Sequence, residues 1–486
     1  MPHPTDTRTK IVATLGPASA APDVLDELLR AGTAVVRLNL SHGSVEEHLA
    51  RLADVRASAE RTGCPVAVLA DLPGPKVRSG RFPEGGVELV GNSTVRLVAA
   101  DEVLAAASDE SRITVDYPTL ATDLRPGDRV VLGDGAISFQ VEHVEDSEVV
   151  CRVLTGGRVQ GRPGVHLPSE RLRLSTPTDE DLRLAPVMAA AGADFLAVSF
   201  VRRAADLRAV REAIAPHRTM LVAKVETLAA IEFLEEIVDE ADAVMVARGD
   251  LGIECPLEDV PHLQKRIVRH CVEVGTPVIT ATQMMESMIT SPSPTRAEVS
   301  DIANAVFDGT DALMLSAETA IGHDPVAVVR TMSRIAGRAE REASYAHWGS
   351  RLGRVQRLQM TDGPDRITMA ITHAAGMAAA DAGASAILCC TRSGRTARAM
   401  ARFRPTPLLV GLSPDPVTVR TMGLSWGVHA LAVDTYATTD ELVWFAVERA
   451  VRAGLVAAGD TVLVLAGAPD RPSGASTDVL RIVRVQ

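Results

Sequence analysis

Aromatic residues are scarce in this chain: Phe, Tyr and Trp together make up 3% of its 486 residues. So few rings do not supply the stacking platform on which proteins bind single-stranded nucleic acid. An excess of positive charge is also lacking, because 50 Lys and Arg stand against 62 Asp and Glu, for a net charge of −12. Binding along a phosphate backbone needs a basic face. No nucleic-acid partner is therefore expected, and any anionic ligand must meet a local group of cations.

Long apolar runs and cysteine motifs are missing as well. The most apolar long window, 184–201, is interrupted by Pro186, Gly192 and Asp194, so it falls short of the ~20 apolar residues that a membrane span needs. The opening MPHPTDTRTK has no apolar signal segment, and the six cysteines show no CxxC spacing. These absences favour a cytoplasmic protein with free thiols and no membrane partner.

Short apolar runs, each followed by a helical pattern, recur along the first 320 residues of a chain long enough for two or three domains. Eight such strand–helix units predict a (β/α)8 TIM barrel, an α/β fold whose active site lies at the C-terminal ends of its strands. The strand ends are therefore candidate site positions. The eight runs are residues 10–15, 34–39, 66–72, 194–200, 220–226, 243–248, 277–282 and 312–317.

Two further domains are expected around the barrel. The third and fourth runs lie 122 positions apart, which is far longer than an ordinary connection. The intervening sequence alternates apolar and polar residues between Gly and Asp turns, as is typical of a small β domain. Beyond a weakly patterned boundary at 347–364, four more apolar runs alternate with helical segments and predict a doubly wound α/β domain. The predicted domains are a catalytic barrel at 1–72 and 169–345, an inserted β-barrel lid at 73–168 and a regulatory domain at 346–486.

Polar and charged side chains follow the second and third runs. Arg37 lies within an otherwise apolar strand, where an unpaired charge is costly. The pattern therefore favours a phosphate-sized anion at this rim over the alternative of solvated loop residues. The side chains in question are Arg37, Asn39, Ser41, His42, Asp71, Lys76 and Arg78.

A lysine and two carboxylates follow the fifth and sixth runs. Lys224 and Glu226 are two positions apart, so in a strand they point to the same side. Glu226 and Asp250, on neighbouring strands, would offer an oxygen site suited to Mg²⁺ or Mn²⁺. A lysine beside such a metal suits the stabilisation of a phosphoryl group or an enolate. In the alternative interpretation Lys224 and Glu226 merely neutralise each other, which leaves Asp250 unexplained.

The last two runs end in further polar residues. Thr282 would bring a hydroxyl to the same rim, although a threonine at a strand end is also an ordinary hydrogen-bonded residue. Ser316 and Glu318 follow the eighth run, where a supporting role behind the site is favoured.

Six stretches, in order on the predicted strand ends, carry a resemblance to a known family. They are RLNLSHG, AKVET, MVARGDLG, ITATQMMESMI, SPTRAEVSDIANAVFDGTDALMLSAETA and TRSGRTAR. From Lys10 onward the chain resembles the pyruvate kinases. The resemblance implies a glycolytic phosphotransferase that moves the phosphoryl group of phosphoenolpyruvate to ADP, giving pyruvate and ATP. It also implies a lid that closes on nucleotide and metal, and a homotetramer.

The resemblance assigns roles to individual residues. Arg37 and Lys224 would contact the transferring phosphoryl group, and Glu226 and Asp250 would hold the divalent ion. Thr282 would belong to the route that protonates the enolate.

Further roles concern the substrate carboxylate, the nucleotide and a monovalent cation. The backbone amides of Gly249 and Asp250 would meet the carboxylate of the substrate. The family's monovalent-cation ligands match Asn39, Ser41, Asp71 and Leu72. The residues toward the nucleotide phosphates are His42, Arg78 and Asn39.

The loop after Asp71 departs from the commoner family pattern. Where K⁺-dependent members typically read Asp-Thr-Lys-Gly-Pro-Glu, this chain reads Asp71-Leu-Pro73-Gly-Pro-Lys76. The ammonium of Lys76 would place a positive charge where K⁺ otherwise sits. We therefore expect an enzyme that needs Mg²⁺ or Mn²⁺ but not K⁺. Pro73 matches neither pattern, and the alternative is that Lys76 points into solvent.

A second anion site is expected in the C-terminal domain. The run 385–390 leads directly into a loop with hydroxyls and a glycine before a helical pattern, which suits an anion, although an ordinary helix cap is the alternative. The resemblance implies that this loop binds the phosphate of an allosteric sugar phosphate or nucleotide. Its residues are Thr391, Arg392, Ser393, Gly394, Arg395 and Thr396.

Two competing functions remain to be separated. A metal-dependent lyase or aldolase acting on pyruvate or phosphoenolpyruvate would use a similar barrel but would not need ADP. A non-enzymatic sensor would retain only the C-terminal anion pocket, which the presence of Lys224, Glu226, Asp250 and Thr282 disfavours.

Overall fold

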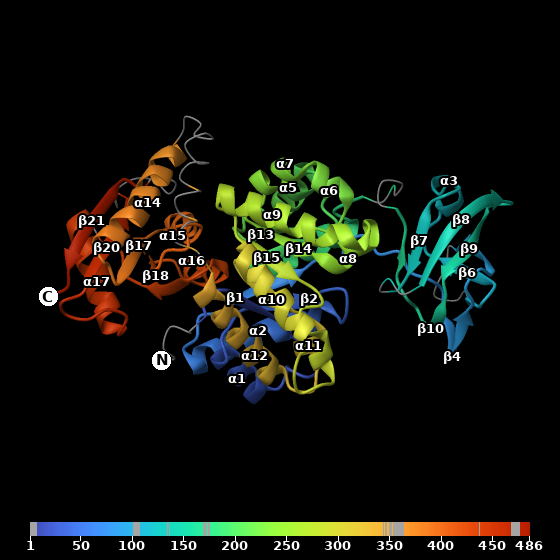
Figure 1. Ribbon diagram of the computed structural model, residues 1–486, viewed down its shortest axis with the longest axis horizontal. Helices are drawn as coiled ribbons and strands as arrows, with labels where there is room; N and C mark the ends of the chain where they lie inside the picture. Colours follow the sequence, from blue (N-terminus) through green and yellow to red (C-terminus); the bar gives the residue numbers. More distant parts are fainter. Residues whose placement is uncertain are drawn as a thin grey trace.

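The computed structural model of the chain has three lobes side by side, with a closed barrel in the middle (Figure 1). The structure describes residues 7–100, 107–133, 135, 137–168, 173, 175–343, 345, 348, 352, 364–436, 438–467 and 477–486. The predicted boundary at 347–364 lies outside these residues apart from 348, 352 and 364.

All eight predicted runs form strands of the parallel barrel, in the spatial order β1-β16-β15-β14-β13-β12-β3-β2. Apolar, mostly β-branched residues fill these strands because both faces are covered, and β12 and β14 are buried throughout. The strands are β1 Lys10–Thr14, β2 Thr33–Asn39, β3 Ala67–Asp71, β12 Phe195–Val198, β13 Met220–Val225, β14 Ala243–Ala247, β15 Val278–Ala281 and β16 Ala312–Leu315.

Helices surround the barrel, and several begin where a side chain caps the first turn. Ser44 and Glu47 form a reciprocal capping box at the start of α2, as do Thr295 and Glu298 at α10. The barrel helices are α1 Pro22–Arg30, α2 Val45–Thr62, α4 Asp179–Ala190, α5 Ala204–Ala213, α6 Leu228–Glu232, α7 Leu234–Glu240, α8 Arg248–Glu254, α9 Val260–Val274, α10 Arg296–Asp308, α11 Ala317–Ala320 and α12 Pro325–Glu342, with short 3-10 turns at Leu257–Asp259 and Glu286–Ile289.

The inserted residues form a separate β lobe. Its strands form a six-stranded sheet, whose edges are β11 and β6, and a two-stranded ribbon. Bridges from Arg78 to Gly164, beside β11, and from Ser79 to Val115, in β6, link the two edges, in agreement with the expected small barrel. Asp146 and Ser147, both with positive φ, make the tight turn between β8 and β9. The elements are β4 Phe82–Leu89, β5 Thr94–Ala99, β6 Arg112–Val115, α3 Leu120–Asp123, β7 Arg129–Leu132, β8 Ile137–Glu145, β9 Glu148–Thr155, β10 Gly157–Gly161 and β11 Val165–His166.

The C-terminal lobe has a five-stranded sheet in the order β19-β18-β17-β20-β21. The four predicted runs supply its parallel strands, and an antiparallel edge strand that the sequence analysis did not predict, β21, completes it. The elements are α14 Pro364–Asp381, β17 Ala386–Cys390, α15 Arg395–Ala401, β18 Leu408–Ser413, α16 Pro416–Thr421, a 3-10 turn at Met422–Leu424, β19 Val428–Ala432, α17 Thr439–Arg452, β20 Thr461–Ala466 and β21 Val479–Arg484.

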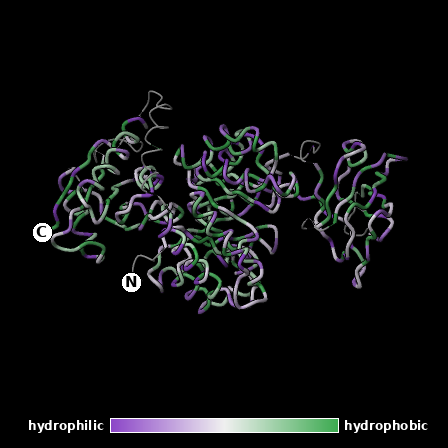
Figure 2. Tube along the Cα trace, viewed as in Figure 1, coloured by the Kyte–Doolittle hydropathy of each residue, from purple (hydrophilic) through white to green (hydrophobic). Residues whose placement is uncertain are grey.

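Hydrophobic residues are distributed along the chain in all three lobes (Figure 2). The buried clusters that they form are connected unequally. One buried cluster runs from the barrel into the C-terminal lobe, whereas the lid has a cluster of its own. The lid therefore packs as a unit with a core separate from that of the barrel. Among the described residues, no helix combines the length and apolarity needed to cross a membrane.

Ion pairs attach the C-terminal lobe to the barrel at the N-terminal ends of its strands. Asp194, just before β12, pairs with Arg420 of the C-terminal lobe at 2.8 Å, and Asp311, just before β16, pairs with Arg404 at 2.9 Å. This attachment is on the opposite end of the barrel from the strand ends that were expected to form the site.

Candidate active site

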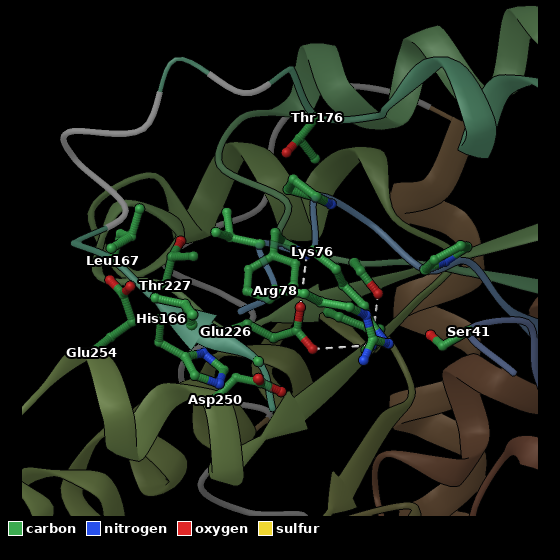
Figure 3. A pocket seen from close by; sticks show the side chains of 18 of the residues that line it. Ser41, Lys76, Arg78, His166, Leu167, Thr176, Glu226, Thr227, Asp250 and Glu254 are labelled. Atoms are coloured by element: carbon green, nitrogen blue, oxygen red, sulfur yellow. Dashed lines mark hydrogen bonds and ion pairs between the residues drawn. The ribbon is translucent and has the colours of Figure 1, made fainter. Parts of the chain in front are cut away.

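A cavity of about 330 Å³ lies at the C-terminal ends of the barrel strands, between the barrel and the lid (Figure 3). Barrel residues from four strand ends line it together with the loop that leads into the lid. His166 and Leu167 of the lid line it beside the barrel residues. The sequence-predicted residues that line it are Arg37, Asn39, Ser41, His42, Lys76, Arg78, Lys224, Glu226 and Asp250.

Lys224 stands at the centre of a buried polar network. Its ammonium lies 3.1 Å from Asp71 Oδ1 and 3.0 Å from Glu226 Oε1, and it donates a hydrogen bond of 2.7 Å to Ser199 Oγ. Arg37 contacts the other oxygen of Asp71 at 2.6 and 2.7 Å. The ion pair between Lys224 and Glu226 is thus real, but it is one part of a network that reaches across β12.

The charges in this network shift one another's protonation. Burial alone would lower the pKa of Lys224, but the carboxylates of Asp71 and Glu226 outweigh it and raise that pKa above its ordinary value. Burial would likewise raise the pKa of Asp71, yet Lys224 and Arg37 hold it below its ordinary value. Lys224 is therefore a fixed cation and Asp71 a fixed anion at neutral pH.

Glu226 and Asp250 form the carboxylate side of the cavity. Burial, and to a lesser extent the nearby Asp250, raises the pKa of Glu226 despite Lys224. Two carboxylates that repel each other in one cavity are the donor set that a hard divalent cation relieves. They fit Mg²⁺ or Mn²⁺ with the remaining ligands from substrate and water. Among the described residues, no cluster of three or more His, Cys, Asp or Glu side chains suits a metal.

Cations gather at the mouth of the cavity, although the chain as a whole is acidic. Lys76 is exposed overall, but desolvation in the cavity, together with the charges of Lys224 and Arg78, lowers its pKa to about 8. Burial, then Lys76 and Arg78, lowers the pKa of His42. A pocket whose basic groups repel one another in this way suits a polyanionic ligand.

The residues expected at a monovalent-cation site are partly engaged with the protein. The Leu72 carbonyl accepts a hydrogen bond of 2.7 Å from Ser199, and Leu72 is 1% exposed. Asp71 is paired with two cations, and Asn39 Oδ1 accepts from the Ser41 amide at 3.2 Å. Asn39 and Ser41 line the cavity, whereas Asp71 and Leu72 lie behind it.

Thr282 and Gly249 are in contact with each other but do not line the cavity, although Gly249 directly precedes Asp250, which does. Thr282 Oγ1 accepts a hydrogen bond of 2.8 Å from the Gly249 amide and donates one of 2.6 Å to the Ala281 carbonyl. The Gly249 amide was expected to meet a substrate carboxylate, but in the structure it is paired with Thr282. A substrate would have to compete for it.

Glu318 supports the Thr282 loop from behind. Its buried carboxylate accepts from the amides of Met285, at 3.1 Å, and Ser316, at 2.7 Å. It joins the ends of β15 and β16, in agreement with the supporting role expected for Ser316 and Glu318.

Several residues that line the cavity were missed by the sequence analysis, among them Ser199, Phe200 and His166. Ser199 bridges Lys224 and the Leu72 carbonyl, and the Phe200 amide donates to Glu226 Oε2 at 2.7 Å. Both follow β12 and are the last two residues of the fourth predicted run, 194–200. The expectation that site residues lie at strand ends could therefore have identified them. His166 belongs to the lid, where no barrel rule applies.

The C-terminal loop has mixed exposure. Gly394, with φ of 75°, precedes α15, and Arg392, Ser393 and Arg395 are exposed. Thr396 is buried with its hydroxyl 2.6 Å from that of Thr477. The Thr396 side chain therefore faces the interior, while most of the residues before it in the loop are more exposed.

The cavity combines a fixed buried lysine, two neighbouring carboxylates and a cationic mouth, and it lies under a separately packed lid. Together these features define a class of enzyme. The molecule is a TIM-barrel enzyme built for a small phosphorylated acid and a divalent cation.

Comparison with known proteins makes the identification specific. The family model described as the barrel domain of pyruvate kinase matches residues 6–329, and the model of its alpha/beta domain matches residues 369–483. The chain therefore belongs to the pyruvate kinase family. The expected fold class is confirmed, as is a phosphotransferase that acts on phosphoenolpyruvate and ADP.

Individual relatives align along almost the whole chain. The pyruvate kinase of Geobacillus stearothermophilus is 41% identical over 480 residues, which is 98% of this chain and 80% of the relative. That of Clostridium acetobutylicum is 36% identical over 482 residues, 99% of this chain and 100% of the relative. That of Methylorubrum extorquens is 39% identical over 478 residues, 98% of this chain and 97% of the relative.

Proposed function

We propose that the cavity transfers the phosphoryl group of phosphoenolpyruvate to ADP, with Lys224 and Arg37 contacting the transferring group. The observation that carries this assignment is the buried Lys224 ammonium, which three oxygens hold at 2.7 to 3.1 Å. A cation fixed in this way needs no reorganisation when negative charge develops on the transferring oxygens. Phosphoryl transfer depends on such positioning rather than on a covalent nucleophile.

Glu226 and Asp250 are proposed to hold one Mg²⁺ or Mn²⁺ ion. When bound, the ion would help neutralise charge on the phosphoryl and enolate oxygens. The chain orients the Glu226 carboxylate, since Oε2 accepts from the Phe200 amide at 2.7 Å while Oε1 lies 3.0 Å from Lys224. This arrangement favours a single carboxylate orientation at the cavity wall.

The nucleotide is proposed to lie at the cationic mouth, with its phosphates toward His42, Arg78 and Asn39. The lid's separate core supports a closing motion that excludes water and suppresses hydrolysis of the phosphoryl group. The amides of Gly249 and Asp250 are assigned to the substrate carboxylate, and Thr282 to the route that protonates the enolate.

We propose that K⁺ is not required. Lys76 lines the cavity and its pKa responds to Asp71 and Asp250, which supports an ammonium in the region where a monovalent ion would act. Asn39, Ser41, Asp71 and Leu72 would then serve as orienting groups.

Further assignments follow family resemblance. The ranges 1–72 with 169–345, 73–168, and 346–486 are proposed as catalytic, lid and regulatory domains of a homotetramer. Thr391 to Thr396 are proposed to bind a phosphorylated effector. Six cysteines without disulfides support a cytoplasmic location.

The test of this function is pyruvate formation from phosphoenolpyruvate with Mg²⁺, measured with and without ADP. Wild type should turn over only when ADP is present, whereas ADP-independent turnover would point to the lyase alternative. Lys265→Met is a matched control, because Lys265 pairs with Asp308 on the barrel surface outside the cavity. It should keep full activity while Lys224→Met loses it. Equal losses would contradict the assignment of Lys224.

A further inference from the structure

The turn that carries Thr282 has an unusual backbone. Thr282 and Gln283 have φ angles of 69° and 54°, so two successive residues with side chains adopt the left-handed conformation. This region is disfavoured for L-residues, and for a β-branched threonine it is a clear outlier. Such a turn persists only when surrounding contacts hold it.

Arg248 supplies those contacts. Its Nε donates to the Ala281 carbonyl at 3.2 Å, and its Nη2 donates to the Thr282 carbonyl at 2.7 Å and lies 2.8 Å from the sulfur of Met284. Nη2 also lies 3.5 Å from the Gln283 carbonyl, so the guanidinium contacts all four consecutive residues of the strained turn, 281–284. Its side chain is 11% exposed, and Arg248 is not among the residues that line the cavity.

The remaining nitrogen of Arg248 is oriented from the neighbouring helices. Nη1 lies 2.7 Å from Asp301 on α10 and donates to Gln264 on α9 at 3.3 Å. A planar guanidinium has its donors in one rigid fork, so fixing one end also fixes the nitrogens that face the turn. Asp301 therefore sets the position of Arg248, and Arg248 sets that of the turn.

We propose that Arg248 is a positioning residue for the protonation half of the reaction, acting through the Thr282 hydroxyl. The inference rests on the proposed role of Thr282. In that half-reaction the enolate formed after the O–P bond breaks takes a proton at its methylene carbon, and its C–O bond becomes the carbonyl of pyruvate. Arg248 donates no proton and meets no substrate. It holds the backbone of the turn through the carbonyls of Ala281 and Thr282, and this fixes the position of the Thr282 side chain.

A double-mutant cycle tests this proposal. The readout is exchange of the pyruvate methyl protons in D₂O, followed by NMR with Mg²⁺ and inorganic phosphate, alongside kcat and KM for phosphoenolpyruvate. Arg248→Met and Thr282→Ala should each slow exchange about ten- to hundredfold, the range expected when a reacting group is misplaced by about 1 Å. The double variant should be no more than about threefold slower than the slower single variant, because both changes remove one function.

Two variants separate positioning from a general loss of structure. Arg248→Lys should recover part of the exchange rate, since an ammonium reaches fewer of the acceptors that the fork contacts. Arg269→Met, on an exposed part of α9, should match wild type. If Arg248→Met does not fold, Asp301→Asn replaces it in the cycle, with an expected loss of about three- to tenfold from the weakened orientation of the fork.

The outcomes are distinct. If the losses of the two single variants multiply in the double variant, the role of Arg248 is overturned and that of Thr282 stands. The same holds if the effect of Arg248→Met is confined to KM for phosphoenolpyruvate. Wild-type exchange in Thr282→Ala would overturn both the proposed role of Thr282 and this inference. If the double variant is little slower than the slower single variant, and Arg248→Lys recovers part of the exchange rate, Arg248 is established as the residue that positions Thr282.

Discussion

Raising the pH through 8 should turn a K⁺-indifferent enzyme into a K⁺-activated one, because Lys76 then loses its proton. The pKa of Lys76 is lowered to about 8 by desolvation in the cavity and by the charges of Lys224 and Arg78. Only the protonated side chain can stand in for a monovalent cation. At a pH above this pKa the Lys76 side chain is neutral, and K⁺ can then bind where the ammonium charge was.

The size of the effect follows from that pKa. With a pKa of about 8, Lys76 is about 90% protonated at pH 7 and about 10% protonated at pH 9. The K⁺-free rate should therefore fall about tenfold between these two pH values, and KCl should restore most of it at pH 9 but change little at pH 7. Bound phosphates raise the pKa of a neighbouring ammonium, so kcat/KM at low substrate should report the value near 8 and kcat a higher one.

The assay is the initial rate of pyruvate formation with Mg²⁺ in buffer free of K⁺ and Na⁺, with ionic strength matched by a bulky organic cation. Lys76→Met and Lys76→Glu should both need K⁺ at every pH, the glutamate more strongly. A large activation of wild type by KCl at pH 7 would refute the reasoning. So would a Lys76→Met variant whose K⁺-free pH profile matches that of wild type, since the loss at high pH would then come from another group.

Three other predictions concern the phosphoryl group, the effector and the metal. Lys224→Met should fold but lose phosphoryl transfer by several orders of magnitude, while exchange of the pyruvate methyl protons survives better; equal losses would show that Lys224 is not specific to phosphoryl transfer. Thr391→Ala with Ser393→Ala should keep basal activity but lose activation by sugar phosphates or AMP, a coupling typically worth ~1 to 3 kcal/mol; the idea fails if none of these shifts the wild-type response to phosphoenolpyruvate. EDTA should abolish turnover and Mg²⁺ restore it, with Glu226→Gln needing at least about tenfold more Mg²⁺; an unchanged requirement would exclude Glu226 as a ligand.

Periodicity located the barrel because both faces of each parallel strand are buried. A near-continuous apolar run such as β14 is then hard to mistake. The same rule failed for β21, an edge strand with half-buried and exposed residues that include Arg481 and Ile482. Its sequence carries no strong burial pattern, and only its ladder with β20 defines it.

Strand ends predicted most of the cavity but not its internal pairing. Lys224 reaches Asp71 across β12, because alternate strands contribute side chains to one layer inside a barrel. Spacing within a single strand cannot reveal such a pair. Nor could the sequence foresee that Thr282 adopts a left-handed backbone, since the contacts that impose it come from a residue 34 positions earlier.

The most direct test of the central claim is the fate of phosphorus in a mixture of enzyme, phosphoenolpyruvate, ADP and Mg²⁺, followed by ³¹P NMR. The phosphoenolpyruvate signal should disappear as the γ-phosphate signal of ATP appears in equal amount, and the Lys224→Met variant should show neither change on the same timescale. Release of inorganic phosphate in place of ATP, or consumption of phosphoenolpyruvate when ADP is omitted, would contradict the account.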